Sequence, residues 1–487
     1  MSSTLLGANH WSGRYFSDGW QPGESRAAVT EKATGHRLET VGLADASAVE
    51  RAVDTAATAQ PGWAALGYDA RAAVLRRAGL LFEQHADEAA EWTARESGAP
   101  LPMAHRAQCV AAQECFEAAG LASAPYGELL RTTAPRLSLA RRRPVGVVGV
   151  IAPFNAPLLL AIRAVAPALA LGNAVVLKPD PRTAVSGGVL IARVFEEAGL
   201  PDGLLHVLPG GADVGQAVVA HPRVPVISFT GSTPAGRAIA RACADQLKRA
   251  HLELGGNSAL VVMDDADVPR AAAAGAFGSF RHAGQICMAS GRHLVHESVV
   301  DDYLAELTRI AAATTVGDPI HRGVGYGPLI DAGQRDRVHG IVTQSVEAGA
   351  SLLAGGTFEG LFYHPTVLSS VPLDAPAYTQ EVFGPVAPVV SFADVDEAAA
   401  LAADSSYGLS LGIITRDVMG ALELADRVPT GSVHINDQTI NDEPTAPFGG
   451  LGESGSGARH GGQQSNLEAF TELQWVTVRR EAPSYPA

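Results

Sequence analysis

The chain has 487 residues, of which 47% are hydrophobic and 18% are charged, so it is long enough for two or more domains with separate cores. Its net charge is −15 and its densest basic stretch is only Arg141-Arg142-Arg143, which argues against a protein that binds nucleic acid. Apolar runs such as 156–171 contain Pro157, Arg163 and Pro167 and fall short of a bilayer span, so no membrane protein is expected.

The N-terminal part of the chain is expected to be helical. Apolar residues recur at three- to four-residue spacing over 70–97, and this pattern ends at Gly98, as helices often do. We therefore predict helices over 46–97.

From residue 145 onward, strand-like runs and helical patterns alternate. Strands are expected at 145–150, 174–177, 205–208, 226–229 and 260–263, and helices at 158–171, 184–198, 212–220 and 234–247. Such alternation predicts a parallel sheet wound with helices, which is the usual scaffold for a nucleotide.

A second alternating region follows. Its strands are expected at 293–297, 364–371, 386–392, 409–415 and 431–436, and its helices at 300–314, 333–349, 393–404 and 417–427. Cys287 lies near the start of this region, so we expect the active site where two α/β domains meet. Residues 131–143 and 471–480 resemble strands without a place in either sheet, and such exposed segments often pair with another subunit.

Cysteine usage points to a reducing compartment. The four cysteines (109, 115, 243 and 287) are too sparse for a disulfide framework and lack the spacing of a zinc site. The first residues, Met-Ser-Ser-Thr-Leu-Leu-Gly, lack the basic region and apolar core of a signal peptide. We therefore expect a cytoplasmic protein without bound metal.

A lone thiol and an upstream carboxylate form the most informative pair. Cys287 lies in His-Ala-Gly-Gln-Ile-Cys-Met-Ala-Ser (282–290), and Glu253 opens Glu-Leu-Gly-Gly-Asn (253–257). Such a pair suits covalent catalysis on a carbonyl, in which a thiolate attacks and a base then delivers water to the acyl-enzyme. The alternative is a small buried cysteine that only fills space.

Two turns that join strands to helices carry groups suited to the same chemistry. Phe229-Thr-Gly-Ser-Thr-Pro-Ala-Gly236 opens a helix whose free N–H groups could hold a phosphate, or it is a plain helix cap. In Pro153-Phe-Asn-Ala-Pro157 the Asn155 amide could donate to an oxyanion, or it caps a proline-bounded turn.

Three further segments have ordinary structural readings beside functional ones. Lys178-Pro179 ends a strand, where the ammonium could reach a ribose or phosphate, and Glu381-Val-Phe-Gly-Pro385 offers a carboxylate for ribose hydroxyls. The glycine-rich loop 448–457 lies near the expected site, and its ordinary structural reading is a flexible connection.

Together and in this order, these motifs resemble the aldehyde dehydrogenase superfamily over about residues 8–480. The Pro-x-Asn-x-Pro turn, Lys-Pro, Phe-Thr-Gly-Ser, Glu-Leu-Gly-Gly-Asn, Gly-Gln-x-Cys, Glu-x-Phe-Gly-Pro and Phe-Gly-Gly-x-x-x-Ser-Gly all stand in sequence. The run 166–173 and Arg163 are similar to the branch of benzaldehyde, vanillin and salicylaldehyde dehydrogenases.

The resemblance implies an α/β fold with three parts. These are a Rossmann-like NAD(P)-binding domain (1–123 and 145–254), an α/β catalytic domain (255–455) and a β oligomerisation arm (124–144 and 470–487). A homodimer or homotetramer would follow.

The resemblance also assigns roles. Cys287 would be the nucleophile, Asn155 and the Cys287 backbone N–H would hold the oxyanion, and Glu253 would activate water. The cofactor, NAD with NADP as the alternative, would lie against Ile151, Pro153, Phe154, Lys178, Gly211, Phe229, Thr230, Gly231, Ser232, Leu254, Glu381 and Phe383. The aldehyde would lie against Leu160, Arg163, Ile286, Met288 and Phe448.

Three departures from the family pattern bear on these roles. Asp180 and Pro181 stand where a small residue and a ribose-binding Glu are common, which weakens the bias against NADP. Ala458-Arg459 replaces an Arg-Glu pair, so a proton relay through that Glu is in doubt. Phe154 and Ala156 stand where Trp and Phe are frequent, which alters the substrate entrance.

The substrate expected from the resemblance is an aromatic, benzaldehyde-like aldehyde. Ile286 and Met288 would offer an apolar wall to a ring, and Arg163 would either serve a ring hydroxyl or anchor its helix. The alternatives are an aliphatic or semialdehyde substrate, transfer of the acyl group to coenzyme A, and a binding protein without turnover. Glu253 counts against the coenzyme A route, because relatives that use it commonly lack this residue.

Overall fold

The computed structural model of the protein describes residues 4–321 and 323–485. Its first large sheet has the strand order β11-β10-β7-β8-β9-β1-β2. Five of its strands are parallel: β7 (Val147–Ile151), β8 (Ala174–Lys178), β9 (Leu205–Val207), β10 (Val226–Thr230) and β11 (Arg249–Glu253), with β11 at one edge. The short β1 (Arg14–Phe16) and β2 (Trp20–Pro22) complete one edge. Every residue of β7 is buried, as expected for a parallel strand covered on both faces.

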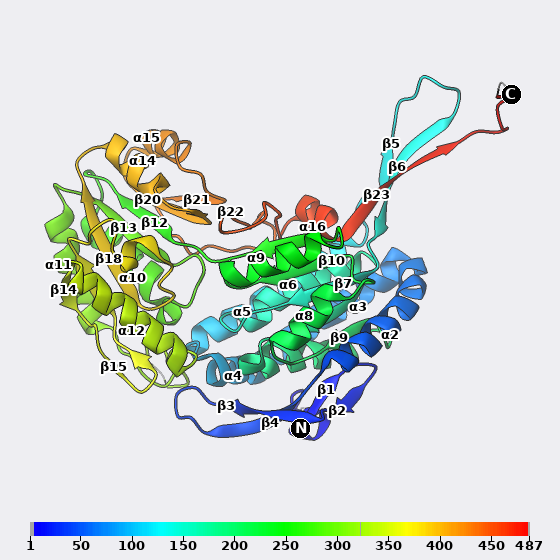
Figure 1. Cartoon of the computed structure of the whole chain (residues 1–487), viewed down its shortest axis with the longest axis horizontal. Coiled ribbons are helices and arrows are strands. Elements are labelled where there is room, and N and C mark those ends of the chain that lie inside the picture. The colour runs from blue at the N-terminus through cyan, green and yellow to red at the C-terminus, as the bar shows by residue number, and fades with distance from the viewer. Residues whose placement is uncertain (1–3, 322, 486–487) are drawn as a thin grey trace.

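Helices surround this sheet (Figure 1). They are α2 (Ala46–Ala65), α3 (Tyr68–Gln84), α4 (Ala86–Ser97), α5 (Leu101–Leu121), α6 (Pro157–Ala170), α7 (Leu190–Glu197), α8 (Ala212–Ala220) and α9 (Thr233–Ala244). The predicted helices over 46–97 and the strand–helix alternation after residue 145 are confirmed. None of the helices in the described part of the chain is long and apolar enough to cross a membrane.

The second large sheet has the order β14-β17-β18-β13-β12-β20-β21. Its strands are β12 (Ser258–Val262), β13 (Ser290–His296), β14 (Ser351–Ala354), β17 (Thr366–Ser369), β18 (Val386–Phe392), β20 (Ser410–Ile414) and β21 (Ser432–Ile435). The helices α10 (Val268–Phe280), α11 (Val300–Ala313), α12 (Ala332–Glu347), α14 (Val395–Ala403) and α15 (Val418–Ala425) accompany it. This second unit lies to the left of the first in Figure 1, and the predicted α/β fold is confirmed.

The two β segments that lacked a sheet pair with each other. The strand β6 (Leu137–Pro144) lies between β5 (Gly127–Leu129) and β23 (Thr471–Val478), and both contacts are antiparallel. This three-stranded sheet projects from the body of the molecule at the upper right of Figure 1.

Local structure departs from the expected pattern in four places. The helix expected over 184–198 starts with a π-helical turn (Val185–Val189), where the buried Glu96 carboxylate accepts hydrogen bonds from the N–H groups of Val185 and Ser186. The sequence pattern also missed α5, the hairpin of β3 (Ser25–Thr30) and β4 (Arg37–Leu43), and the polar strand β11.

Candidate active site

Cys287 follows a tight turn that precedes β13. His282, Ala283 and Gly284 have φ angles of 52°, 54° and 67°, in the left-handed region that non-glycine residues rarely adopt. A Cβ at Gly284 would collide with the Gly384 carbonyl. The Gln285 side chain holds the turn, since its Oε1 accepts the Ile330 N–H at 2.9 Å. The position of the thiol is therefore fixed by backbone that contacts several distant segments.

Glu253 reaches the same region from the end of β11. The residues after it support the nucleophile loop, because a Cβ at Gly256 would collide with the Cys287 carbonyl oxygen. The Leu254 N–H donates to the Ser454 carbonyl at 2.9 Å, which ties this strand end to the glycine-rich loop. The second glycine of Glu-Leu-Gly-Gly-Asn thus makes the close approach of the two motifs feasible.

Asn155 joins them from the loop between β7 and α6. Its Nδ2 donates to the Gln285 carbonyl at 2.9 Å, two residues before the thiol. A carboxamide nitrogen carries two hydrogens, so this bond orients the amide and leaves a second donor. The three catalytic candidates therefore converge from three elements that are far apart in the sequence.

Burial dominates the protonation of the thiol and the carboxyl. Burial raises the pKa of Cys287 to about 12, with the carboxylates of Glu381 and Glu253 acting in the same direction and Arg163 against it. Burial also raises the pKa of Glu253 to about 8, opposed by Arg163 and Arg459. Both carboxyl oxygens of Glu253 are buried and, within the described residues, have no hydrogen-bond partner. A carboxyl with this pKa is suited to accept a proton and release it near neutral pH.

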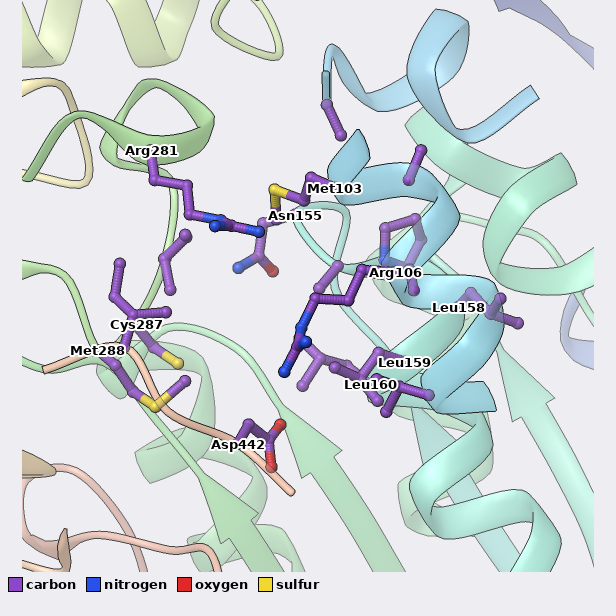
Figure 2. A pocket seen from close by; sticks show the side chains of 18 of the residues that line it. Met103, Arg106, Asn155, Leu158, Leu159, Leu160, Arg281, Cys287, Met288 and Asp442 are labelled. Carbon is purple, nitrogen blue, oxygen red and sulfur yellow. The ribbon is translucent and has the colours of Figure 1, made fainter. Parts of the chain in front are cut away.

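A cavity of about 330 Å³ opens onto the thiol, which is within the usual size range for a small-molecule site. Figure 2 shows Cys287 and Met288 on one side and Leu159 and Leu160 opposite, with Asn155 between them. All five residues predicted for the aldehyde line it, namely Leu160, Arg163, Ile286, Met288 and Phe448.

Arg163 lies in the wall of this cavity and is only 2% exposed. It forms an ion pair with Asp442, and its guanidinium carbon lies 4.7 Å from the centre of the Phe448 ring. Its Nε and Nη1 atoms are buried, and no partner for them occurs among the described residues. Arg163 therefore both anchors its helix and retains donors beside the cavity.

Sequence reasoning missed other residues of the cavity. Met103 and Arg106 come from α5, Phe277 and Arg281 from the end of α10 and the turn after it, and Asp442 from the loop after β21. No motif marked them, and recognition of α5 as a helix beside α6 would have been the available signal for the first two.

Residues predicted for the cofactor gather at one edge of the first sheet. Ile151 ends β7, and Pro153 and Phe154 follow it; Lys178 ends β8, and Gly211 caps α8 after β9. Phe229 and Thr230 end β10, and Gly231 and Ser232 join it to α9. The carboxyl ends of parallel strands form the ligand-binding edge in this class of sheet, at the point where strand order reverses. Here β8 and β10 lie on opposite sides of β7.

The start of α9 fits an anionic group. Ser232 caps this helix without a side-chain hydrogen bond, so the first-turn N–H groups stay available to a ligand. A Cβ at Gly231 would lie 2.5 Å from the Phe229 ring, so the glycine also makes room for that ring. Leu254 packs against α9 at Gly236. A larger residue at position 236 would collide with the leucine side chain.

Glu381 and Phe383 extend toward this edge from the unit built on the second sheet. Arg337 donates to the carbonyls of Glu381 at 2.7 Å and Val382 at 2.9 Å, and Glu381 Oε1 accepts the Gly256 N–H at 3.1 Å. Burial raises the pKa of Glu381 to about 7. The Phe383 ring meets that of Phe154 edge to face at 6.0 Å.

Two departures from the family pattern have structural consequences. Arg182 forms ion pairs with Asp180 at 2.8 Å and Asp331 at 2.7 Å, and it lies 4.3 Å from the centre of the Phe154 ring. The Asp180 carboxylate is therefore engaged with this arginine. Arg459 donates to the Gly450 carbonyl at 3.2 Å, and its charge opposes the burial that raises the pKa of the nearby Glu253.

Comparison with known proteins finds similarity to aldehyde dehydrogenases. A profile of the Aldehyde dehydrogenase family matches residues 20–476. A vanillin dehydrogenase from Amycolatopsis sp. is 60% identical over 99% of this chain and 100% of that protein. Benzaldehyde dehydrogenase [NAD(+)] from Pseudomonas putida is 48% identical over 98% of each.

Solved structures with the same fold are similar to this chain over nearly its whole length. An NADP-dependent enzyme from E. coli superposes with a TM-score of 0.94 at 32% identity, covering 97% of this chain and 99% of that chain. An NAD-dependent aldehyde dehydrogenase from Sinorhizobium meliloti gives 0.93 at 32% identity, covering 97% and 95%.

Proposed function

The chain belongs to the aldehyde dehydrogenase family, and from this premise we propose that it oxidises an aromatic aldehyde of the benzaldehyde or vanillin type to the carboxylic acid. The observation that carries the proposal is an apolar cavity that opens directly onto a fixed thiol. Two relatives at 48% and 60% identity, similar over nearly their whole length, bear names of aromatic aldehyde dehydrogenases.

The chemistry of the cavity wall supports a ring substrate. Ile286, Met288, Leu160 and Phe448 supply apolar and aromatic surface that suits a flat ring. Arg106, Arg281 and Asp442 also line the cavity and could accommodate polar ring substituents such as hydroxyl or methoxy groups. Aliphatic aldehydes and semialdehydes remain the alternatives, and they would leave this apolar wall less fully covered.

For the first chemical step we propose that the Cys287 thiol gives its proton to water in the cavity and attacks the carbonyl carbon as the thiolate. The Asn155 amide and the Cys287 backbone N–H would hold the oxyanion, and this N–H donates no hydrogen bond within the described residues. Loss of one such donor typically raises the barrier by about 2.7–4 kcal/mol. Glu253 would then take a proton from water, whose oxygen attacks the thioester and releases the acid and the thiolate.

We propose NAD as the cofactor, held by the residues at the carboxyl edge of the first sheet and by Glu381. The available N–H groups at the start of α9 suit a pyrophosphate, and Lys178 and Glu381 suit ribose hydroxyls. When bound, the nicotinamide supplies the acceptor for the hydride of the aldehyde. NADP is the alternative, because Pro181 offers no carboxylate against a 2′-phosphate and Asp180 is paired with Arg182.

Two other outcomes are less well supported. Transfer of the acyl group to coenzyme A would not need a water-activating base, whereas Glu253 is buried beside the thiol with a pKa near neutrality. A binding protein without turnover would have no need for the three convergent catalytic candidates.

We also propose a cytoplasmic location, because the four cysteines are free thiols.

The substrate proposal predicts an order of rates. NAD and NADP are each combined with benzaldehyde, vanillin, hexanal and succinate semialdehyde, and kcat/KM is measured from the absorbance of the reduced nicotinamide. We expect the highest kcat/KM with NAD and the two aromatic aldehydes. A higher value with hexanal or the semialdehyde would overturn the aromatic assignment while leaving the family chemistry intact.

We propose that the three-stranded sheet of β5, β6 and β23 (124–144 and 470–487) joins copies of the chain. We also propose a cofactor domain (1–123 and 145–254) and a catalytic domain (255–455). Leu129 is 75% exposed and Leu473 and Trp475 are each 64% exposed on the arm, which is the apolar surface an interface would cover.

The arm proposal predicts that Leu129→Asp combined with Leu473→Asp lowers the particle mass measured by light scattering. A charge in a buried interface opposes association. The matched control is Leu247→Asp, which alters a still more exposed leucine on the body and should leave the mass unchanged. A double variant with the wild-type mass, or a monomeric wild type, would contradict the proposal.

A further inference from the structure

Two buried histidines lie behind Glu253, and the chemistry described so far does not use them. His251 precedes Glu253 by two residues on β11, so both side chains point to the same face of the sheet. The His251 ring stacks on the ring of His460, with centroids 4.0 Å apart and planes inclined by 16°. Both residues are 1% exposed, and His460 comes from the loop before α16 (Gln463–Phe470).

This cluster contains an unusual number of unsatisfied polar atoms. Both ring nitrogens of His251, Nδ1 of His460 and both carboxyl oxygens of Glu253 are buried and lack hydrogen-bond partners within the described residues. Native proteins pair nearly all such groups. His251 Nε2 lies 3.9 Å from Glu253 Oε1, so a small movement of the carboxyl would join two unsatisfied groups. His460 Nε2 faces the Ser228 hydroxyl at 3.4 Å.

The charges around His251 favour its neutral form. Arg249 extends from its own strand, Arg163 from α6 and Arg459 from the loop that carries His460. Burial and these three cations lower the pKa of His251 to about 4. On the remaining sides lie the Phe470 ring, at a centroid distance of 6.4 Å, Ser228 on β10 beyond His460, and Glu253. A neutral imidazole has one N–H, and the nearby carboxylate attracts it to Nε2.

We propose that His251 is a positioning residue for the water-activating step, whose Nε2–H donates a hydrogen bond to the ionised Glu253 carboxylate. The His460 ring holds the His251 ring in place by stacking. This inference rests on the proposed function, since it requires Glu253 to act as the base on an acyl-enzyme. The proton taken from water stays on Glu253, and His251 neither gains nor loses a proton in the step.

Two substitutions separate the donor from the stacked ring. His251→Phe keeps a ring that can stack on His460 and removes the N–H, whereas His251→Gln keeps a donor and removes the ring. Loss of the donor destabilises ionised Glu253 and raises its pKa further, so a smaller fraction is ionised at pH 7. We expect the Phe variant to hydrolyse its acyl-enzyme about tenfold more slowly at pH 7.

The measurement is the hydrolysis rate of the acyl-enzyme between pH 6 and about 10, followed by intact mass after quenching a reaction with benzaldehyde and NAD. In the wild type the rate should rise with pH and level off near the Glu253 pKa of about 8. The Phe variant should keep the wild-type burst of reduced cofactor while its curve moves to higher pH. The Gln variant should keep a curve close to that of the wild type.

The control is His206→Gln, which alters another buried histidine, bonded to Ser17 and the Gly203 carbonyl in the same domain. A Phe curve that coincides with the wild type would overturn the inference. Equal slowing by the Phe, Gln and His206 variants without a shift in pH would also overturn it, since that indicates a merely structural role. His251→Leu replaces the Phe variant if the latter does not fold. A wild type that forms no acyl-enzyme would reject the proposed function itself.

Discussion

Replacement of Cys287 by Ala is expected to abolish aldehyde oxidation, with kcat lowered by at least about 10⁴-fold. The other groups near the carbonyl could still bind and polarise it, but no atom would remain to form the thioester. Reduced nicotinamide, measured under conditions that saturate the wild type, should not form above the background rate. Turnover close to that of the wild type would reject the covalent mechanism.

Cys109 provides the matched control. It is an exposed thiol on α5, whereas Cys287 is partly buried at the cavity, so Cys109→Ala should retain wild-type turnover. Iodoacetamide should inactivate the Cys109→Ala protein with one alkyl group at Cys287, detected by peptide mass analysis. Inactivation without modification of Cys287 would assign the essential thiol to another position.

The sequence predicted the architecture because strands and helices alternate with clear turn signals. The helix expected over 212–220 and the strand over 386–392 match α8 and β18 at both ends. The strand β11 was missed because Arg249–Glu253 is polar, although it pairs with β10 along its full length. Its strand character comes from that neighbour rather than from its own residues.

The candidate site was predictable where motifs lie at strand ends. Asn155, Glu253 and Cys287 belong to short patterns with recognisable chemistry; Asn155 and Cys287 line the cavity, and Glu253 lies at the end of β11. The partners of these residues were not predictable. Asp442 pairs with Arg163 across 279 positions, and the His251 ring meets His460 only after folding. Such contacts depend on tertiary packing, which spacing along one chain does not encode.

Replacement of Glu253 by Gln should leave the first turnover intact and slow later turnovers by about 10²–10⁴-fold. Gln has nearly the same shape but cannot take a proton from water, so the acyl group should stay on Cys287. A burst of reduced cofactor close to one per active site should be followed by a slow phase. Intact mass should show the protein increased by one acyl group during that phase.

Glu114→Gln tests whether this effect is specific to the base. Burial raises the pKa of Glu114 to about 7, and Arg163 lowers it, as for Glu253, yet Glu114 lies on α5, whereas the charge of Glu253 acts directly on the pKa of Cys287. This variant should turn over steadily without accumulating acyl-enzyme. If both variants stalled alike, the electrostatic environment of Arg163 would explain the result better than proton transfer to Glu253. Steady turnover by Glu253→Gln would contradict the proposed route, because glutamine cannot take a proton from water. Another group would then have to activate the water.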